Sequence, residues 1–444
     1  MRRWEWSAWV TIVFGVAALW CCYGSSTAYA FDSVPYGDEL ALAQLLWERA
    51  AEVLQARTAL EQGRSALLRA RTYPNPSLEG AWSAVPIGKT NPPGLSDRLD
   101  RVPNYSVGLA ELIEIGKRQP RIAARSHDVE RLSAEAQAVL GDRFFALLET
   151  IGTIATNQRR VGVLEEQIRD GNELLELDRA RANRGEIAPL DVDVAEVEQA
   201  RLRALRDSAE ASLLQAQTDC SALLSLPCPR FPNEEAAWQF LVQTYRSVPA
   251  TDPTMEEVLQ QRPDARALQA AIAAAQKDAV VAQRRVVPDV TVRAGYTYDQ
   301  FTMAGNQRNS LGFGVELPLP VFDRGQADLV AARASEVQAR TLLEILRQNT
   351  PEHLRMAREQ LGLALRRMEQ LDVGVAKARA MRDTLVEAQR AGGISAIEVL
   401  VARRNYQDLV RERIELDQDA FEAALRIRKL IGLFPKISPK ESLE

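Results

Sequence analysis

The side chains that could do chemistry are few in this sequence of 444 residues. Its two histidines, His127 and His353, lie in charged helical stretches, and we expect both to be solvated. The run Gly312-Phe-Gly314 lacks the third glycine and the following helix of a dinucleotide site. There is no nucleophile elbow, phosphate-binding loop or zincin motif. We therefore expect no catalytic, cofactor-binding or metal-binding residues, and no enzyme activity.

Two cysteines, Cys220 and Cys228, lie close together near the middle of the chain. In an oxidising compartment such a pair can form a disulfide, and a pair of free buried thiols fits the sequence equally well. A metal site would need further ligands nearby, and the surrounding sequence offers none. The pair is therefore a candidate disulfide rather than a candidate metal centre.

The N-terminus has the pattern of a secretory signal peptide. A charged start and an apolar run lead to the small-residue site Ala28-Tyr-Ala30, which predicts a signal peptide over residues 1–30. Cys21 and Cys22 leave lipidation as an alternative, although no small residues directly precede either of them. The formal net charge of the chain is −5. With no basic stripe and no aromatic stacking platform, we expect no binding of nucleic acid.

Four segments alternate between apolar and small or polar residues, which predicts β-strands. We place them at about 76–84, 104–113, 288–299 and 309–319. Their length and alternation suit strands that cross a membrane, with the apolar side facing lipid. The expected lipid-facing residues are Val292, Tyr296, Phe313 and Val315. A soluble hairpin with one buried face is the alternative.

The second pair of strands belongs to a second copy of one large unit. Ala51-Glu-Val-Leu-Gln-Ala matches Ala265-Arg-Ala-Leu-Gln-Ala, and Pro74 falls on Pro288. Each copy has the order helix, strand, strand, long helix, glycine turn, helix, with turns near 185 and 392. We therefore divide the mature chain into a first repeat, a connection in the equatorial region, a second repeat and a C-terminal tail, at residues 31–228, 229–262, 263–435 and 436–444.

This duplicated order resembles the TolC-like outer membrane efflux protein family. The motifs that carry the resemblance are Pro74-Asn-Pro-Ser-Leu, Gly116-Lys-Arg-Gln, Gly185-x-x-x-x-Leu-Asp-Val, Pro318-Leu-Pro-Val-Phe-Asp-Arg-Gly and Gly392-x-x-x-x-Ile-Glu-Val. Two runs, Ile113-Glu-Ile-Gly-Lys-Arg and Pro320-Val-Phe-Asp-Arg-Gly-Gln, are most similar to the cobalt-zinc-cadmium resistance branch.

The resemblance implies an α+β membrane protein with long antiparallel helical hairpins that form a periplasmic tube. Four strands per chain would contribute to a trimeric, 12-stranded barrel in the Gram-negative outer membrane. The implied function is the exit duct of a tripartite efflux system, with heavy-metal cations as one candidate substrate and with no cofactor. Its partners would be two further copies of the chain, a periplasmic adaptor protein, an inner-membrane pump and outer-membrane lipid. A periplasmic coiled-coil scaffold without channel activity is the alternative.

The resemblance also implies two kinds of site in this chain. The helix–turn–helix tips would dock the adaptor through Gly185, Ile187, Leu190, Gly392, Ile394 and Ile397. The alternative is that these residues only close the turns. Glu398, with Asp191 at the equivalent place in the first repeat, would form a ring of carboxylates at a pore gate. The family's second acid is replaced by Val401, and a helix-start glutamate favoured by the helix dipole is the alternative for Glu398.

Overall fold

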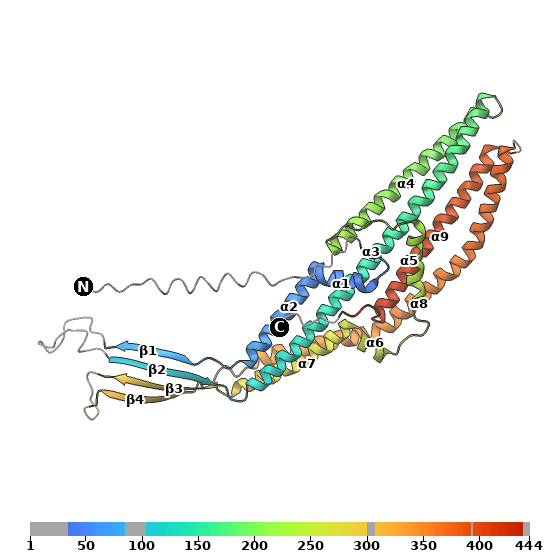
Figure 1. Cartoon of the computed structure of the whole chain (residues 1–444). Coiled ribbons are helices and arrows are strands. Elements are labelled where there is room, and N and C mark those ends of the chain that lie inside the picture. The colour runs from blue at the N-terminus through green and yellow to red at the C-terminus, as the bar shows by residue number, and fades with distance from the viewer. Residues whose placement is uncertain (1–33, 85–103, 300–306, 392–393, 438–444) are drawn as a thin grey trace, which may run out of the picture. The chain divides into compact units, whose positions relative to one another are not determined.

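A computed structural model describes residues 34–84, 104–299, 307–391 and 394–437 of the chain (Figure 1). The chain divides into two units, residues 1–34 and 35–444, and the account below concerns the second. The predicted signal peptide, Gly392 and most of the predicted C-terminal tail lie outside the described residues. Among the helices that are described, none is long and apolar enough to cross a membrane.

The strands form one antiparallel sheet in the order β1-β2-β3-β4 within the described residues. The strands are β1 Ser77–Ser83, β2 Asn104–Ile113, β3 Val290–Tyr298 and β4 Asn309–Glu316. β4 ends before residue 319, where the sequence pattern placed its end. Pro318 and Pro320 explain the difference, because proline has no backbone N–H to donate to a strand ladder.

Helices make up most of the remaining described chain. Their bounds are α1 Glu39–Arg49, α2 Ala51–Arg71, α3 Arg118–Asn183, α4 Pro189–Leu224, α5 Glu234–Arg246, α6 Met255–Gln261, α7 Pro263–Gln283, α8 Gln326–Arg390 and α9 Ala396–Leu430, with a short 3-10 turn, η1, at Arg284–Val286. The predicted connection at 229–262 thus contains two helices, α5 and α6. α5 packs on α3 and α9, which ties the two repeats together.

Each strand of the sheet is joined along the chain to one helix. α2 leads into β1, β2 leads into α3, α7 leads through η1 into β3, and β4 leads into α8. α2 packs against α3, α3 against α7, and α7 against α8, so the four helices keep the order of the four strands (Figure 1).

The helices α8 and α9 form a hairpin with a seam like that of a coiled coil. On α8 the buried seam residues alternate steps of three and four, which keeps one narrow stripe against the partner helix. They are Leu354, Ala357, Leu361, Ala364 and Met368. They pack against Leu416, Ala420, Ala423 and Ile427 of α9 and against Ile431, the residue that follows the helix. About every second residue of this seam is alanine, whose small side chain lets the axes of the two helices approach closely.

The first hairpin, α3 with α4, meets the second hairpin through the long helix α3. α3 packs against α9 and carries Phe144, Leu148 and Ile151, which are almost completely buried. Gly152 makes room there for Phe421 of α9, since a Cβ on Gly152 would lie 2.2 Å from a ring atom. The core of the molecule therefore runs along α3, between the two hairpins.

Candidate functional site

One face of the sheet is exposed and apolar, except for Glu111, which lies opposite Val292 near the helix end of β2. The register places Leu109, Ala294 and Phe313 side by side on that face, and Val107, Tyr296 and Leu311 side by side in the next row. Phe313 is 83% exposed in a single chain. The predicted lipid-facing residues Val292, Tyr296, Phe313 and Val315 all lie on this face. An apolar face of this size is unfavourable in water, so it marks a contact surface. The length of the strands suits contact with the hydrocarbon of a bilayer.

The opposite face of the sheet is polar and small. A row of glycines, Gly108, Gly295 and Gly312, crosses β2, β3 and β4 there. Beside this row, Arg293 Nη2 lies 2.6 Å from Glu316 Oε2. The outer edges of β1 and β4 have no strand partner within the described chain. A sheet with one apolar face, one charged face and two open edges is suited to line an aqueous passage once its edges are paired.

The first helix–turn–helix tip ends α3 in a Schellman motif. Gly185 has a φ of +73°. The Gly185 N–H donates to the Ala182 carbonyl and the Glu186 N–H donates to the Arg181 carbonyl. A positive φ is easiest for glycine, which explains the residue at this position. Leu190, in the first turn of α4, is 67% exposed, whereas Ile187 is half-buried.

The second tip joins α8 to α9, and its Gly392 lies outside the described residues. Ser395 is the N-cap of α9 and its Oγ accepts a hydrogen bond from the Glu398 N–H at 3.4 Å. The same Oγ donates to Glu398 Oε1 at 3.3 Å. Ile394 is half-buried and Ile397 is exposed. Glu398 therefore sits in the first turn of α9, exposed, with a local partner that holds its carboxylate.

Behind the two tips, polar side chains join one hairpin to the other. We call this set the tip cluster, and it consists of Asp178, Arg181, Glu198, Gln389, Arg403 and Arg404. Arg181 donates from Nη1 to the Gln389 carbonyl at 2.6 Å and from Nη2 to the Arg390 carbonyl at 2.8 Å, so it caps the C-terminal end of α8. Arg404 Nε lies 2.9 Å from Glu198 Oε2, which links α9 to α4.

Burial shifts the pKa values of two residues of the tip cluster. Burial raises the pKa of the Asp178 carboxyl above its ordinary value, and Arg181 acts in the opposite direction. Burial also lowers the pKa of the Arg403 guanidinium.

Asp191, predicted from the sequence as a gate residue, is half-buried and lines a hollow of about 30 Å³ that it shares with Ile397. The structure thus brings these two predicted residues to the same space between the hairpins.

Sequence reasoning missed the tip cluster. Asp178 and Arg181 are spaced for one helix face, but the same is true of many charged pairs along α3. The partners of these residues, Gln389 and Arg403, lie more than two hundred residues away, and no local pattern marks them. A buried carboxylate in a helix is visible only when the neighbouring helices are in place.

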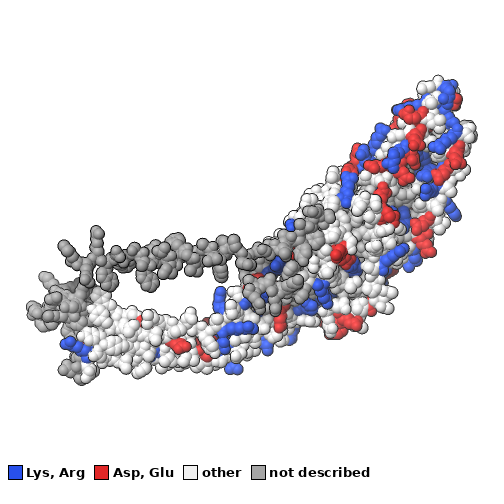
Figure 2. Space-filling view, viewed as in Figure 1, with Lys and Arg blue, Asp and Glu red and all other residues white. Residues whose placement is uncertain are grey.

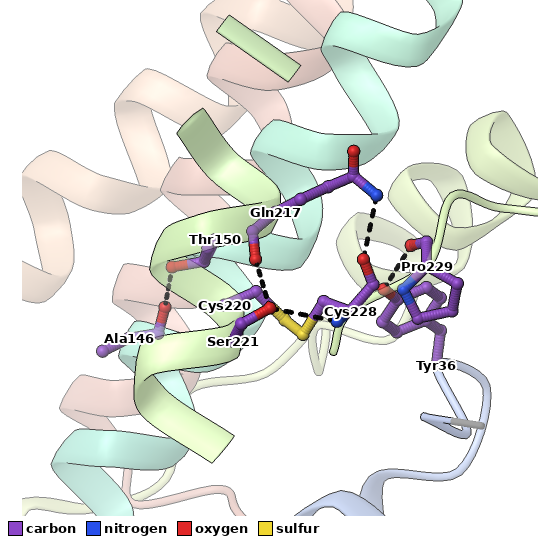
Figure 3. Close-up of a disulfide and its surroundings, with 8 residues drawn as sticks. All are labelled: Tyr36, Ala146, Thr150, Gln217, Cys220, Ser221, Cys228 and Pro229. Atoms are coloured by element: carbon purple, nitrogen blue, oxygen red, sulfur yellow. Dashed lines mark hydrogen bonds between the residues drawn. A yellow bond between two sulfur atoms is a disulfide. The ribbon is translucent and has the colours of Figure 1, made fainter. Parts of the chain in front are cut away.

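Cys220 and Cys228 form a disulfide at the end of α4 (Figure 3). Gln217 Nε2 donates to the Cys228 carbonyl at 2.9 Å, and the Cys228 N–H donates to Ser221 Oγ at 3.1 Å. Just beyond, the Tyr36 hydroxyl donates to the Pro229 carbonyl at 2.6 Å. The disulfide therefore closes the end of the first repeat and supports the segment that precedes α1.

Comparison with known proteins shows which sequences this chain is similar to. The family model of the outer membrane efflux proteins matches residues 254–433. The cobalt-zinc-cadmium resistance protein CzcC of Cupriavidus metallidurans is 26% identical over 379 residues, which cover 85% of this chain and 82% of the relative. The second half of the chain is therefore similar to the outer membrane efflux proteins.

Solved structures of membrane channels have the same fold as this chain. The OprN channel superposes with a TM-score of 0.68 at 20% identity, over 89% of this chain and 91% of the channel. The CusC channel superposes with a TM-score of 0.70 at 16% identity, over 88% of this chain and 91% of that one. These similarities show that the chain has the fold of these channels.

Proposed function

We propose that this protein is the outer-membrane channel of a tripartite efflux system, extending into the periplasm, and that it is a homotrimer in which three four-stranded sheets close a 12-stranded barrel. The observation that carries the proposal is the sheet with an apolar exposed face and two open edges. Backbone groups at an open edge cannot be left unpaired in hydrocarbon. Four strands are also too few to close a barrel, since the smallest have about eight. Pairing β1 of one chain with β4 of the next satisfies both edges and keeps the charged face inside.

We further propose that the duct carries divalent heavy-metal cations. The proposal is supported by the similarity to a cobalt-zinc-cadmium resistance protein over most of both chains. The described residues contain no group of three or more His, Cys, Asp and Glu that could hold a metal ion. A duct needs no such site, because its substrate only passes through. The protein itself would carry out no reaction.

The tips are the proposed contact with the periplasmic adaptor, through which the duct would reach the inner-membrane pump. The proposal is supported by the apolar side chains that project beside the turns, Leu190 on the first tip and Ile397 on the second. Exposed apolar side chains at the end of a hairpin are suited to a partner of similar shape. Gly185 would contribute by keeping the first turn tight.

Glu398 and Asp191 are the proposed gate. In a trimer, one exposed Glu398 from each chain would form a ring of three carboxylates around the axis. Such a ring attracts cations and repels anions. The half-buried position of Asp191, against the tip cluster, supports a role in holding the hairpins together as well as in the gate.

One experiment separates the duct from the alternative, a scaffold that conducts nothing. The protein, extracted from purified outer membranes in detergent, is reconstituted into a planar bilayer and its conductance is recorded. If the protein is a duct, a trimeric preparation should give single-channel steps of conductance. A strain that lacks the gene should lose metal tolerance, and the intact gene should restore that tolerance. A protein that stays in the periplasmic fraction and gives no conductance would support the scaffold.

A further inference from the structure

Arginine side chains gather where the four strands pass into the four helices. We call this group the basic arc. It takes Arg69 and Arg71 from the last turn of α2, Arg118 from the start of α3, Arg284 from η1 and Arg324 from just before α8. Because α2, α3, α7 and α8 lie side by side in the order of the strands, these residues follow one line across the molecule. Figure 2 shows Lys and Arg at this junction, next to a strand end with few charges.

The cations of the basic arc have no carboxylate partner among the described residues, unlike their neighbours. Lys117 Nζ lies 2.9 Å from Asp289 Oδ2, and Arg285 Nη1 lies 2.5 Å from Asp328 Oδ2. Arg118 instead stacks on the Tyr73 ring at 4.1 Å, and its Nη2 donates to the Arg71 carbonyl at 2.6 Å. These contacts fix the Arg118 guanidinium but leave its charge uncompensated.

A band of exposed apolar side chains lies between the basic arc and the apolar face of the sheet. Tyr73 is 71% exposed and Phe322 is 91% exposed. Ile115, Val286 and Leu319 are exposed in the same stretches of chain. Aromatic rings next to arginines are typical of the border between hydrocarbon and headgroups, because arginine can keep its stem in the apolar layer and its guanidinium in water.

A hollow in this junction gives an anion a place to bind. It has a volume of about 490 Å³ and is lined by Arg69, Tyr73, Pro74, Glu114 and Arg121, among others. A water molecule takes about 30 Å³ of liquid, so the hollow has room for a group many times larger. Arg121 is already paired with Glu114, whereas Arg69 is exposed and unpaired among the described residues. A phosphodiester is an anion that the planar fork of a guanidinium group such as Arg69 can bind through two parallel hydrogen bonds.

We propose that the basic arc binds the phosphodiester headgroups of anionic phospholipids in the leaflet of the outer membrane that faces the periplasm. The inference rests on the proposed position of the sheet in the membrane. Lipid is favoured over free phosphate because the apolar band lies directly beside the arginines, where the acyl chains of a bound lipid would begin. The periplasmic leaflet is favoured because the arc lies at the helix end of the strands, opposite the loops.

The test measures lipid binding by the whole protein, purified from outer membranes in a nonionic detergent and delipidated. Phosphatidylglycerol, phosphatidylcholine and inorganic phosphate are the probes, and native mass spectra report the bound lipids. The variants are R69Q/R71Q and R284Q/R324Q, which remove no side-chain hydrogen bond or ion pair within the described chain. The control is R347Q, which changes an exposed arginine of α8 roughly 30 Å further along that helix at 1.5 Å per residue.

We expect the wild type and R347Q to bind phosphatidylglycerol at least about tenfold more tightly than phosphatidylcholine. Each arginine near an anionic surface contributes on the order of fivefold in affinity, so each double variant should lose most of this preference. Equal affinity for the two lipids, or unchanged preference in both variants, would overturn the proposal. Full displacement of phosphatidylglycerol by millimolar phosphate would also overturn it, in favour of a free-anion site. The same spectra report the trimer, so failure of the trimeric duct is recognised separately.

Discussion

Asp178 of α3 and Gln389 of α8 form a buried hydrogen bond between the two hairpins, with Gln389 Nε2 donating to Asp178 Oδ1 at 2.9 Å. Asp178 is 3% exposed and Gln389 is 2% exposed. The oxygen of the same side-chain amide, Gln389 Oε1, has no hydrogen-bond partner among the described residues. A protonated Asp178 carries an O–H that could donate to such an oxygen, whereas an ionised one cannot. Protonation of Asp178 should therefore strengthen the contact between the hairpins.

The pH dependence of stability provides the first prediction. Burial raises the pKa of Asp178, so its contribution to stability is full below the ordinary value of 3.8 and is lost as the pH rises through the raised pKa. Arg181 and Arg403 oppose the shift, and Asp191 adds to it. D178N keeps the acceptor without the charge. We expect it to have a higher melting temperature than the wild type near neutral pH and a flatter pH profile.

The measurement is thermal unfolding in detergent between about pH 4 and about pH 8. E176Q, at an exposed carboxylate of the same helix, is the control and should follow the wild type. If D178N and the wild type lose stability in parallel as the pH rises, Asp178 does not control the contact.

Two adjacent positions of β4 test the faces of the sheet. F313R places a charge on the apolar face and G312R places the same charge on the opposite face, where a Cβ meets open space. A charge facing lipid costs about 2–4 kcal/mol at mid-bilayer. We expect F313R to be depleted from the outer membrane as a trimer, and G312R to assemble nearly as the wild type does. Native gels of outer-membrane extracts would show this, and equal levels of the two variants would refute the assignment of faces.

Arginine substitutions at the tips test adaptor docking. Ile187 and Ile394 are each half-buried beside a turn, so I187R and I394R alter the tip surface. We expect metal tolerance to fall to the level of the deletion strain while the trimer remains in the outer membrane, because the contact with the adaptor is lost. Both quantities are measured in the same cells. Loss of the trimer in step with tolerance would mean that these residues serve only to close the turns.

The gate is tested by E398Q, which removes one charge per chain and keeps an oxygen that can accept from Ser395 Oγ. We expect weaker preference for cations and weaker block by divalent cations, since three carboxylates would leave the ring. Reversal potentials across a salt gradient and block titrations in a planar bilayer measure the two effects. E359Q, at an exposed acid on the middle of α8, is the control. Identical selectivity in E398Q and the wild type would assign Glu398 to the start of α9 alone.

Two glycines offer a matched test of the helix packing. G152A should destabilise the protein by about 1–3 kcal/mol, because the added methyl group would collide with the Phe421 ring. G374A, in the interior of α8 where a Cβ meets no atom within 4 Å, should stabilise it by roughly 0.5–1 kcal/mol by restricting the unfolded chain. Thermal unfolding of both variants in the same detergent gives the comparison. A destabilised G374A or an unaffected G152A would contradict the packing of α3 on α9.

The long helices and the strands could be predicted because their patterns are local. Alternation of side chains marks Val290–Tyr298 as a strand, and the glycine near each tip marks the end of a long helix. The break between α1 and α2 could not be predicted in this way. Ala50 has an extended conformation there, with no proline or glycine to indicate it. The burial of α1 against α2 and α3 explains the break, and such packing is not visible in a short stretch of sequence.

The candidate site was predictable only where it coincides with a turn. Gly185 stands out because a positive φ favours glycine, whereas Asp178 has no local feature that separates it from the solvated acids of α3. The basic arc was missed for a related reason. Its members are unremarkable arginines in four distant segments, and only the shared order of strands and helices brings them into line.

The two open edges of the sheet have a kinetic consequence. In the proposed trimer, a single chain that enters the membrane alone would expose β1 and β4 backbone groups to hydrocarbon, so the monomer would have no stable inserted state. Insertion and association should therefore occur as one step, whose rate rises more steeply than in proportion to the concentration of chains. At low chain concentration the protein would then remain in the aqueous phase without inserting. The apolar face of its sheet would stay accessible to chaperones and proteases.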